Sequence, residues 1–232
     1  MTISIKNIMY RQYGKRSFDF TLSLILALLS LPLIIIIACV IKFSSFKDPV
    51  FFITEMVGFK AKLFKIIKFR TMIIHEVNYN LRKDNNSKLG EISLNDPRIT
   101  NIGKFLRRYK LDELPQLLNV LKGDMSLIGP RPMDYTRYIN SSDFQKQRVL
   151  IRPGISGIAQ TNGNIKFNWA ERIEMDIWYI ANVSFLLDIK IIMKTIKVVI
   201  IGEKVSKNGY KQRINDYRVD LKKSLNSAFI ET

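Results

Sequence analysis

KLDELPQLLNVLKGDMSLIGPRP, residues 110–132, is the stretch around which the rest of the chain is organised. It places two adjacent carboxylates, Asp112 and Glu113, directly before leucines at helical spacing. Pro115 falls in the first turn, where a missing backbone N–H costs least. Gly123 can close the helix in a left-handed cap. The pattern predicts a helix that begins at Asp112, as N-cap or first-turn residue, and ends before Gly123.

A helix start carries unpaired amides and the positive end of the dipole, so it favours a carboxylate and can also receive phosphate. We therefore expect Asp112 to stay ionised. A few residues later, Gly129-Pro130-Arg131-Pro132 holds one guanidinium on a stiff turn. Two interpretations are open from these residues alone. Asp112 and Glu113 either cap a helix or act chemically on a phosphate.

The composition favours an anionic partner. The chain has 232 residues, enough for one domain, and its 37 Lys and Arg against 20 Asp and Glu give a formal charge of +17. A hydrophobic content of 47 % excludes a disordered basic tail. The single cysteine, Cys39, excludes a disulfide framework, and the single histidine, His75, leaves little material for zinc or Ser-His-Asp chemistry. Acid–base chemistry must come from carboxylates, Lys or Tyr.

Residues 18–41 are almost wholly apolar and long enough to be a membrane helix. A cleaved signal peptide is the competing interpretation, but the run is longer than an h-region and no A-x-A-like site follows. Pro32 interrupts the helix near its centre, and Ser30 can deepen the bend. Basic residues flank both ends, although Lys and Arg normally collect on the cytoplasmic side. A re-entrant helix that enters and leaves by one leaflet is favoured over a kinked span and over a buried soluble helix.

The next segments predict a small β-hairpin and a short basic helix. Residues 50–53 and 63–69 are rich in β-formers, with Gly58 between them. Residues 76–96 are polar and predict a surface loop, such as a lid. Residues 102–109 have an apolar helical face, and their basic residues lie directly before Asp112.

Beyond residue 132 the sequence predicts another arginine-bearing turn at Arg152-Pro153-Gly154, a tight turn at Asn162-Gly163 and two helices, over 169–180 and 185–201. The lysines of the second helix share one side, which is typical of a helix at a membrane interface; a buried core helix with a lysine edge is the alternative. We expect an α+β, mostly helical fold. It comprises a basic N-terminal segment (1–17), a membrane re-entrant helix (18–41), a catalytic domain (42–202) and a basic C-terminal tail (203–232).

The chain carries no GxGxxG, GxxxxGK[ST] or HExxH, and no recognisable DNA-binding or RNP-type pattern, so nucleic acid is not expected as a partner. It offers an apolar anchor, two adjacent acids and arginines on stiffened turns. Arginine matches phosphate oxygens bidentately, paired carboxylates can hold Mg²⁺ against a pyrophosphate, and a carboxylate can attack phosphorus. Together these features indicate phosphoryl transfer at a membrane surface.

Over roughly residues 14–201 the chain resembles the bacterial sugar transferases, the small monotopic phosphoglycosyl transferases. The resemblance is carried by ordered motifs: Lys15-Arg16-x-Phe18-Asp19, Pro49-Val50-Phe51-Phe52, Lys68-Phe69-Arg70-Thr71-Met72, Asp96-Pro97-Arg98-Ile99-Thr100, Leu111-Asp112-Glu113-Leu114-Pro115-Gln116, Gly123-Asp124-Met125-Ser126, Gly129-Pro130-Arg131-Pro132, Arg152-Pro153-Gly154 and Asp176-x-x-Tyr179-x-x-Asn182. The resemblance implies the small, single-domain form of the family.

The resemblance also implies roles for residues. Asp112 would attack the sugar-proximal phosphate of a UDP-sugar and release UMP, and polyprenyl (undecaprenyl) phosphate would then accept the phosphosugar. Glu113 would assist, with Asp112, in binding Mg²⁺ and would handle the acceptor's proton. The residues expected to contact substrate phosphate are Arg107, Arg131 and Arg152, followed by Arg70, Arg98, Arg108 and Lys15.

The resemblance places the protein in the bacterial inner membrane, with the catalytic domain on the cytoplasmic face and membrane lipid as a further partner. This would be the first membrane step of capsule, exopolysaccharide or glycoprotein glycan synthesis. Homodimerisation is left open. The alternative from a different class is a non-catalytic, basic, membrane-anchored protein that recruits acidic partners.

Overall fold

The computed structural model describes residues 9–73, 96–162, 168–201, 215–217 and 219–220. Most of the predicted loop at 76–96, the turn residue Gly163 and most of the C-terminal tail lie outside these residues. The described part is mostly helical, with two small two-stranded sheets. This confirms the predicted α+β fold class.

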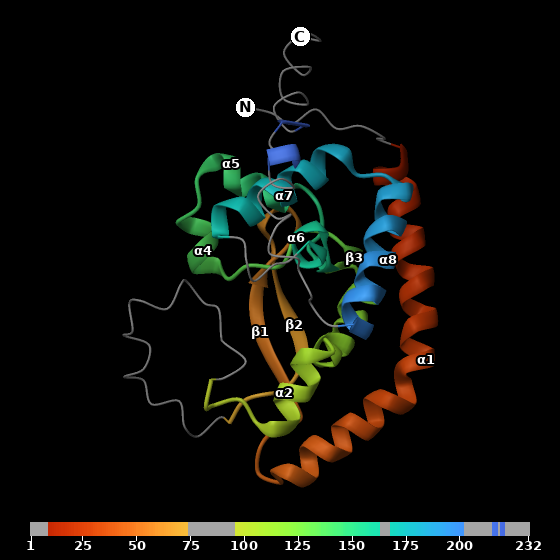
Figure 1. The fold of residues 1–232 in the computed structure, drawn as a ribbon, viewed down its shortest axis with the longest axis vertical. Coiled ribbons are helices and arrows are strands. Elements are labelled where there is room, and N and C mark those ends of the chain that lie inside the picture. The colour runs from red at the N-terminus through yellow and green to blue at the C-terminus, as the bar shows by residue number, and fades with distance from the viewer. Residues whose placement is uncertain (1–8, 74–95, 163–167, 202–214, 218, 221–232) are drawn as a thin grey trace.

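A single long helix, α1 (Lys15–Ser44), follows a short π-helical segment (Tyr10–Gly14) and contains the predicted apolar run. Its 30 residues correspond to about 45 Å, longer than the roughly 30 Å hydrocarbon core of a bilayer. Among the described residues, α1 is the helix long and apolar enough to cross a membrane. Leu29, near its middle, is 74 % exposed. Figure 1 shows that the helix bends partway along its length, and Pro32 supplies the break in its hydrogen bonding.

Both ends of α1 contact the same folded body. At the N-terminal end, Lys15 Nζ lies 2.7 Å from Asp188 Oδ2 on α8 (Phe185–Ile201), and Asp19 accepts a 2.7 Å hydrogen bond from Ser126 Oγ. At the other end, Ile37 and Ile41 belong to a core cluster with Phe69 and Leu106. The bend therefore returns the C-terminal end of α1 to the domain that its N-terminal end has already reached.

The predicted hairpin is confirmed. β1 (Phe51–Val57) pairs antiparallel with β2 (Leu63–Phe69), from Phe51 opposite Phe69 to Val57 opposite Leu63. The two faces of β2 serve different cores: Ile66 lies in the main core, whereas Phe69 packs against α1. This follows from the alternation of side chains along a strand.

A second, parallel pair of strands corrects one prediction. Residues around Arg152 were expected to form only a turn, but β4 (Gly154–Ser156) pairs with β3 (Ser126–Ile128) directly after it. The two backbones approach so closely that a Cβ added at Gly154 would lie 2.1 Å from the Gly129 nitrogen. Glycine is therefore required where the two turns meet. The sequence signal was hidden because a three-residue strand leaves no alternating pattern.

The segment of the acid pair also differs from the prediction. Asp112 does not cap an α-helix: a 3₁₀ segment, η4 (Leu111–Gln116), comes first, and α3 (Leu117–Lys122) follows it. Lys110, with φ of 57°, separates η4 from the preceding helix. Asp112 does lie in the first turn of η4, and Gly123 closes α3 in the left-handed conformation, as expected.

The remaining helices complete the body around a core formed mainly by β3, α3, α6, α7 and α8. Their bounds are α2 (Asn101–Arg108), α4 (Tyr135–Ile139), α5 (Asp143–Lys146), the 3₁₀ segment η5 (Gln147–Leu150), α6 (Ile158–Thr161), α7 (Trp169–Asn182) and α8 (Phe185–Ile201). Figure 1 shows α8 alongside the N-terminal part of α1. One face of α8 is buried through Ile191, while Leu186 and Met193 are 71 % and 62 % exposed. The helix therefore combines a core face with an exposed apolar face.

Candidate active site

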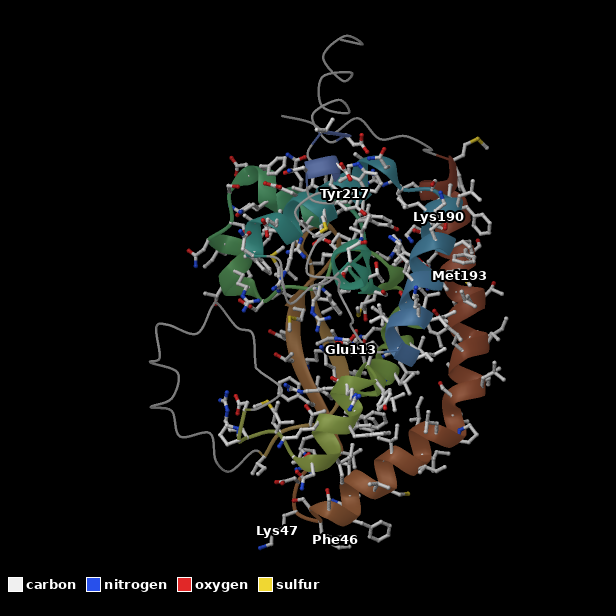
Figure 2. The ribbon with its side chains drawn as sticks, viewed as in Figure 1. Phe46, Lys47, Glu113, Lys190, Met193 and Tyr217 are labelled. Atoms are coloured by element: carbon white, nitrogen blue, oxygen red, sulfur yellow. The ribbon has the colours of Figure 1, made fainter. Side chains whose placement is uncertain are left out.

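Glu113 lies at the centre of the candidate site, where η4, β2 and the turn after β3 meet; Figure 2 labels it within the body of the molecule. Its Oε1 atom lies 2.9 Å from Arg131 Nη2 and 3.4 Å from Lys68 Nζ. Beside it is a cavity of about 130 Å³. The lining includes Lys68, Glu113, Gln116, Arg131, Asp134 and Arg137. Because typical ligand pockets measure roughly 300–1,000 Å³, this cavity can enclose one group of a ligand rather than the whole.

Asp112 differs from its neighbour in how it is held. Within the described part of the chain, the Asp112 carboxylate has no hydrogen-bond or ion-pair partner, whereas Glu113 has two cationic partners. Burial raises the pKa of Asp112, and the charge of Glu113 raises it further, while Lys68, Arg107 and Lys110 oppose this change. Burial and Glu113 thus act against the ionised form of Asp112, and no α-helix dipole offsets them because no α-helix begins at this residue. That Asp112 stays ionised at neutral pH remains a prediction.

The pKa of Glu113 moves in the opposite direction. Burial acts to raise it, but Arg131, Lys68 and Lys110 outweigh burial and leave the pKa at about 2. Two adjacent carboxylates thus have different environments, a common basis for different chemical roles. Glu113 is a fixed anion in an ion-pair network. Asp112 is a carboxylate with unused hydrogen-bonding capacity, as a nucleophile must have.

Among the predicted phosphate-binding residues, the structure brings Arg107 and Arg131 to the acid pair. Arg107 Nε donates a 2.9 Å hydrogen bond to Thr71 Oγ1, and its charge acts on Asp112. Arg98 lies at the margin: it forms a 2.7 Å ion pair with Asp96 and contributes to the electrostatic environment of Arg107.

The other predicted phosphate-binding residues contact different groups. Lys15 and Arg70 are buried, the first against Asp188 and the second 2.9 Å from Asp48 Oδ2, where both attach α1 to the domain. Arg152 Nε donates to the Gly123 carbonyl oxygen, and its guanidinium lies over the Phe59 ring. Arg108 is exposed and lies over the Tyr109 ring. The structure does not bring these four side chains to the cluster around Glu113.

Four polar residues that line the cavity were missed, namely Lys68, Gln116, Asp134 and Arg137. Lys68 belongs to the same motif as Arg70, and strand alternation places it on the same face of β2 as Ile66. Both Lys68 and Ile66 line the cavity. Gln116 lies three residues after Glu113, a spacing that brings side chains together in a 3₁₀ turn. Arg137, on α4, reaches the cavity through tertiary packing, and its local sequence gave no signal of this.

The acid pair fits the predicted magnesium ion. Mg²⁺ usually keeps several waters and is bound by one or two carboxylates together with substrate phosphates. Asp112 and Glu113 supply two carboxylates on adjacent residues, of which Glu113 lines the cavity. No group of three or more His, Cys, Asp or Glu suited to a metal occurs among the residues that the structure describes. The donor set therefore suits a metal shared with a phosphorylated substrate better than an all-protein metal cage.

Comparison with known proteins defines the class. Residues 10–202 match the family described as bacterial sugar transferase, so the chain belongs to that family and is an enzyme. The chain is 37 % identical to the uncharacterised sugar transferase EpsL of Bacillus subtilis, over 84 % of this chain and 92 % of that protein. It is 36 % identical to the exopolysaccharide production protein ExoY of Sinorhizobium fredii, over 80 % and 85 % of the two chains.

A further relative is larger. The chain is 36 % identical to the undecaprenyl-phosphate galactose phosphotransferase of Salmonella typhimurium, over 86 % of this chain but 44 % of that protein. The present chain thus spans less than half of that relative.

The opposite pKa changes predict opposite effects of two matched substitutions on stability. At pH 7, Asp112→Asn removes a charge that the fold disfavours and should raise the melting temperature. Glu113→Gln leaves Lys68 and Arg131 without their anion and should lower stability by about 1–3 kcal/mol. The folded pKa of Glu113 lies below its usual value of 4.5, so its contribution is present above pH 4.5 and is lost as the pH falls toward 2.

Thermal unfolding of the purified protein in detergent, between pH 3 and pH 8, measures both effects. Equal changes in melting temperature for the two variants at pH 7 would contradict this account of the pair.

Proposed function

We propose that the protein transfers a sugar-1-phosphate from a UDP-sugar to polyprenyl phosphate, with Asp112 as the nucleophile. The observation that carries the proposal is the asymmetry of the acid pair: Asp112 is unpartnered within the described residues and lies among cations, while Glu113 is held by Lys68 and Arg131. Support comes from relatives named as undecaprenyl-phosphate galactose and glucose phosphotransferases and as an exopolysaccharide production protein.

In the first step, an oxygen of Asp112 attacks the sugar-proximal phosphorus of the donor. An O–P bond forms as the bond from phosphorus to the bridging oxygen breaks, and UMP leaves with the electron pair. In the second step, a phosphate oxygen of the polyprenyl acceptor attacks the same phosphorus. The bond to Asp112 then breaks, which restores the carboxylate and yields a polyprenyl-diphospho-sugar.

Arg107 and Arg131 would contact the phosphates of the donor, because both guanidiniums act on the acid pair. Asp112 and Glu113 would hold Mg²⁺, which when bound would neutralise part of the pyrophosphate charge. The pKa of about 2 makes Glu113 a poor proton acceptor, so this proposal favours its role as a fixed anion over the predicted role in proton transfer. A direct phosphate contact from Arg152, Arg70, Arg98, Arg108 or Lys15 stays a prediction.

The proposal places α1 in the bacterial inner membrane as a re-entrant helix, with the catalytic domain on the cytoplasmic face. Its support is that both ends of α1 contact one domain, while Leu29, close to Pro32, is 74 % exposed. The exposed apolar side chains of α8, near lysines such as Lys190, suit the same membrane surface (Figure 2). Homodimerisation stays a prediction.

The test of the activity is release of UMP from a panel of UDP-sugars by membranes that contain the protein, with Mg²⁺ and polyprenyl phosphate. At least one donor should yield UMP and a lipid-linked sugar. Asp112→Asn should lower this rate by at least about a thousandfold, because no neighbouring group replaces a missing nucleophile. Asp143→Asn, which makes the same change at an exposed carboxylate on α5 outside the cavity lining, is the matched control and should retain most activity.

If the wild-type protein releases no more UMP than Asp112→Asn with any donor in the panel, the protein does not catalyse the proposed reaction. The non-catalytic alternative would then be favoured, and it predicts salt-sensitive binding of acidic partners that survives Asp112→Asn.

Labelling of single cysteines tests the topology in a Cys39→Ser background. Tyr13→Cys and Lys47→Cys lie before and after the apolar part of α1, and Leu29→Cys lies near its bend. An impermeant maleimide should miss both flanking cysteines in intact spheroplasts and label both after permeabilisation, while Leu29→Cys stays protected. Labelling of only one flanking cysteine in intact spheroplasts would show a spanning helix and would contradict re-entry.

A further inference from the structure

Side chains from outside the turn at 129–132, which carries Arg131, contact two backbone carbonyl oxygens in and next to the turn. Arg148 Nη2 donates a 2.8 Å hydrogen bond to the carbonyl oxygen of Arg131 itself. The Tyr179 hydroxyl on α7, which is 2.5 Å from Asp188 Oδ1, also lies 3.3 Å from the carbonyl oxygen of Ile128, directly before the turn. Both contacts are made to the backbone of this segment and not to the Arg131 guanidinium. They can therefore fix the backbone position from which the Arg131 side chain extends, without contacting a substrate.

Arg148 is in turn fixed by Asp176, also on α7. Asp176 Oδ2 lies 2.6 Å from Arg148 Nη2, and the two side chains are only 2 % and 3 % exposed. Asp176 and Tyr179 belong to the motif Asp176-x-x-Tyr179-x-x-Asn182, for which the sequence suggested no role. Since residues three apart share a helix face, this motif presents both groups toward the same turn.

This buried pair is poorly explained by stability. Burial raises the pKa of Asp176 to about 6, and the charge of Arg148 only partly offsets this. In addition, Arg148 Nε and Nη1 are buried without a hydrogen-bond partner in the described part of the protein. Replacing such a pair with apolar residues is often neutral or stabilising. A geometric role is then a better reason for the pair than its contribution to folding.

A second arginine of the cavity is connected to the same place. The guanidinium carbons of Arg148 and Arg137 each lie 5.2 Å from the centre of the Trp169 ring. Arg137 lines the cavity beside Glu113, as Arg131 does. Arg148 therefore contacts the backbone of one cavity arginine and the aromatic ring against which the other packs.

We infer that Asp176 and Arg148 form a positioning pair, which holds Arg131 at the distance from Glu113 that lets its guanidinium bind substrate phosphate. The inference rests on the proposed function insofar as Arg131 meets phosphate there. Neither member of the pair needs to touch the substrate. Removing the pair should therefore weaken phosphate binding only when Arg131 is present. A general contribution to folding would not depend on Arg131 in this way.

The test is a double-mutant cycle on the full-length protein in detergent. Its first readout is the affinity for inorganic pyrophosphate by calorimetry, which does not depend on turnover. Arg131→Ala should weaken binding about tenfold, the loss of one charge-assisted contact. The apolar replacement Arg148→Met with Asp176→Leu avoids leaving one buried charge unpaired. It should keep the fold, checked by thermal unfolding, yet weaken pyrophosphate binding by a similar factor.

Combining Arg131→Ala with the apolar pair should add little further loss, because both changes remove the same interaction. A matched control is the buried pair of Arg70 and Asp48, whose apolar replacement should combine additively with Arg131→Ala. Arg148→Lys, which keeps the charge but not the planar fork, should restore only part of the affinity.

Additive losses of about a hundredfold, or unchanged affinity in the folded apolar pair, would overturn the positioning role. No effect of Arg131→Ala on pyrophosphate would overturn it as well. The second readout is kcat/KM for UMP release. An inactive wild-type enzyme with the expected pyrophosphate cycle would count against the proposed reaction and not against the positioning pair.

Discussion

The ion pairs from Lys68 and Arg131 to Glu113 are the interaction on which the candidate site depends. They join the end of β2, the 3₁₀ segment η4 and the turn after β3 at one oxygen atom. Arg131, Lys68 and Lys110 together outweigh the burial of Glu113 and lower the pKa of its carboxylate. Because Lys68 and Arg131 pair with Glu113, Asp112 lies in the same positive environment but has no hydrogen-bond or ion-pair partner among the described residues. One network thus produces both the fixed anion and the available nucleophile.

The second constraint is that α1 must fit both a membrane and a compact domain. Its apolar middle is exposed, while contacts from its two ends lead to the same body. Polar contacts help to attach the two ends of α1 to the domain: Lys15 with Asp188, Asp19 with Ser126, and Arg70 with Asp48 near the helix end. These residues had been assigned to phosphate or left without a role. Their positions suggest that much of the basic charge serves to dock the helix.

Local patterns in the sequence predicted the elements well, and tertiary contacts explain what they missed. The apolar run, the hairpin, the left-handed Gly123 and the helices after residue 168 all followed from spacing and turn chemistry. The order of arginines along the chain could not show which ones reach the acid pair. Arg107, on α2, acts on Asp112 through its charge, and Arg131, in the turn after β3, pairs with Glu113, whereas Arg152 is directed to Gly123. Lys68 could have been found from strand alternation; Arg137 could not.

The central claim is that Asp112 itself carries the phosphosugar. A single-turnover experiment without polyprenyl phosphate tests it most directly, by mixing purified protein with its UDP-sugar and Mg²⁺ and measuring UMP and the mass of the protein. The account predicts a burst of about one UMP per protein and a sugar-phosphate adduct on the peptide that contains Asp112, both absent in Asp112→Asn. UMP release that strictly requires the polyprenyl acceptor, with no adduct on Asp112, would contradict it.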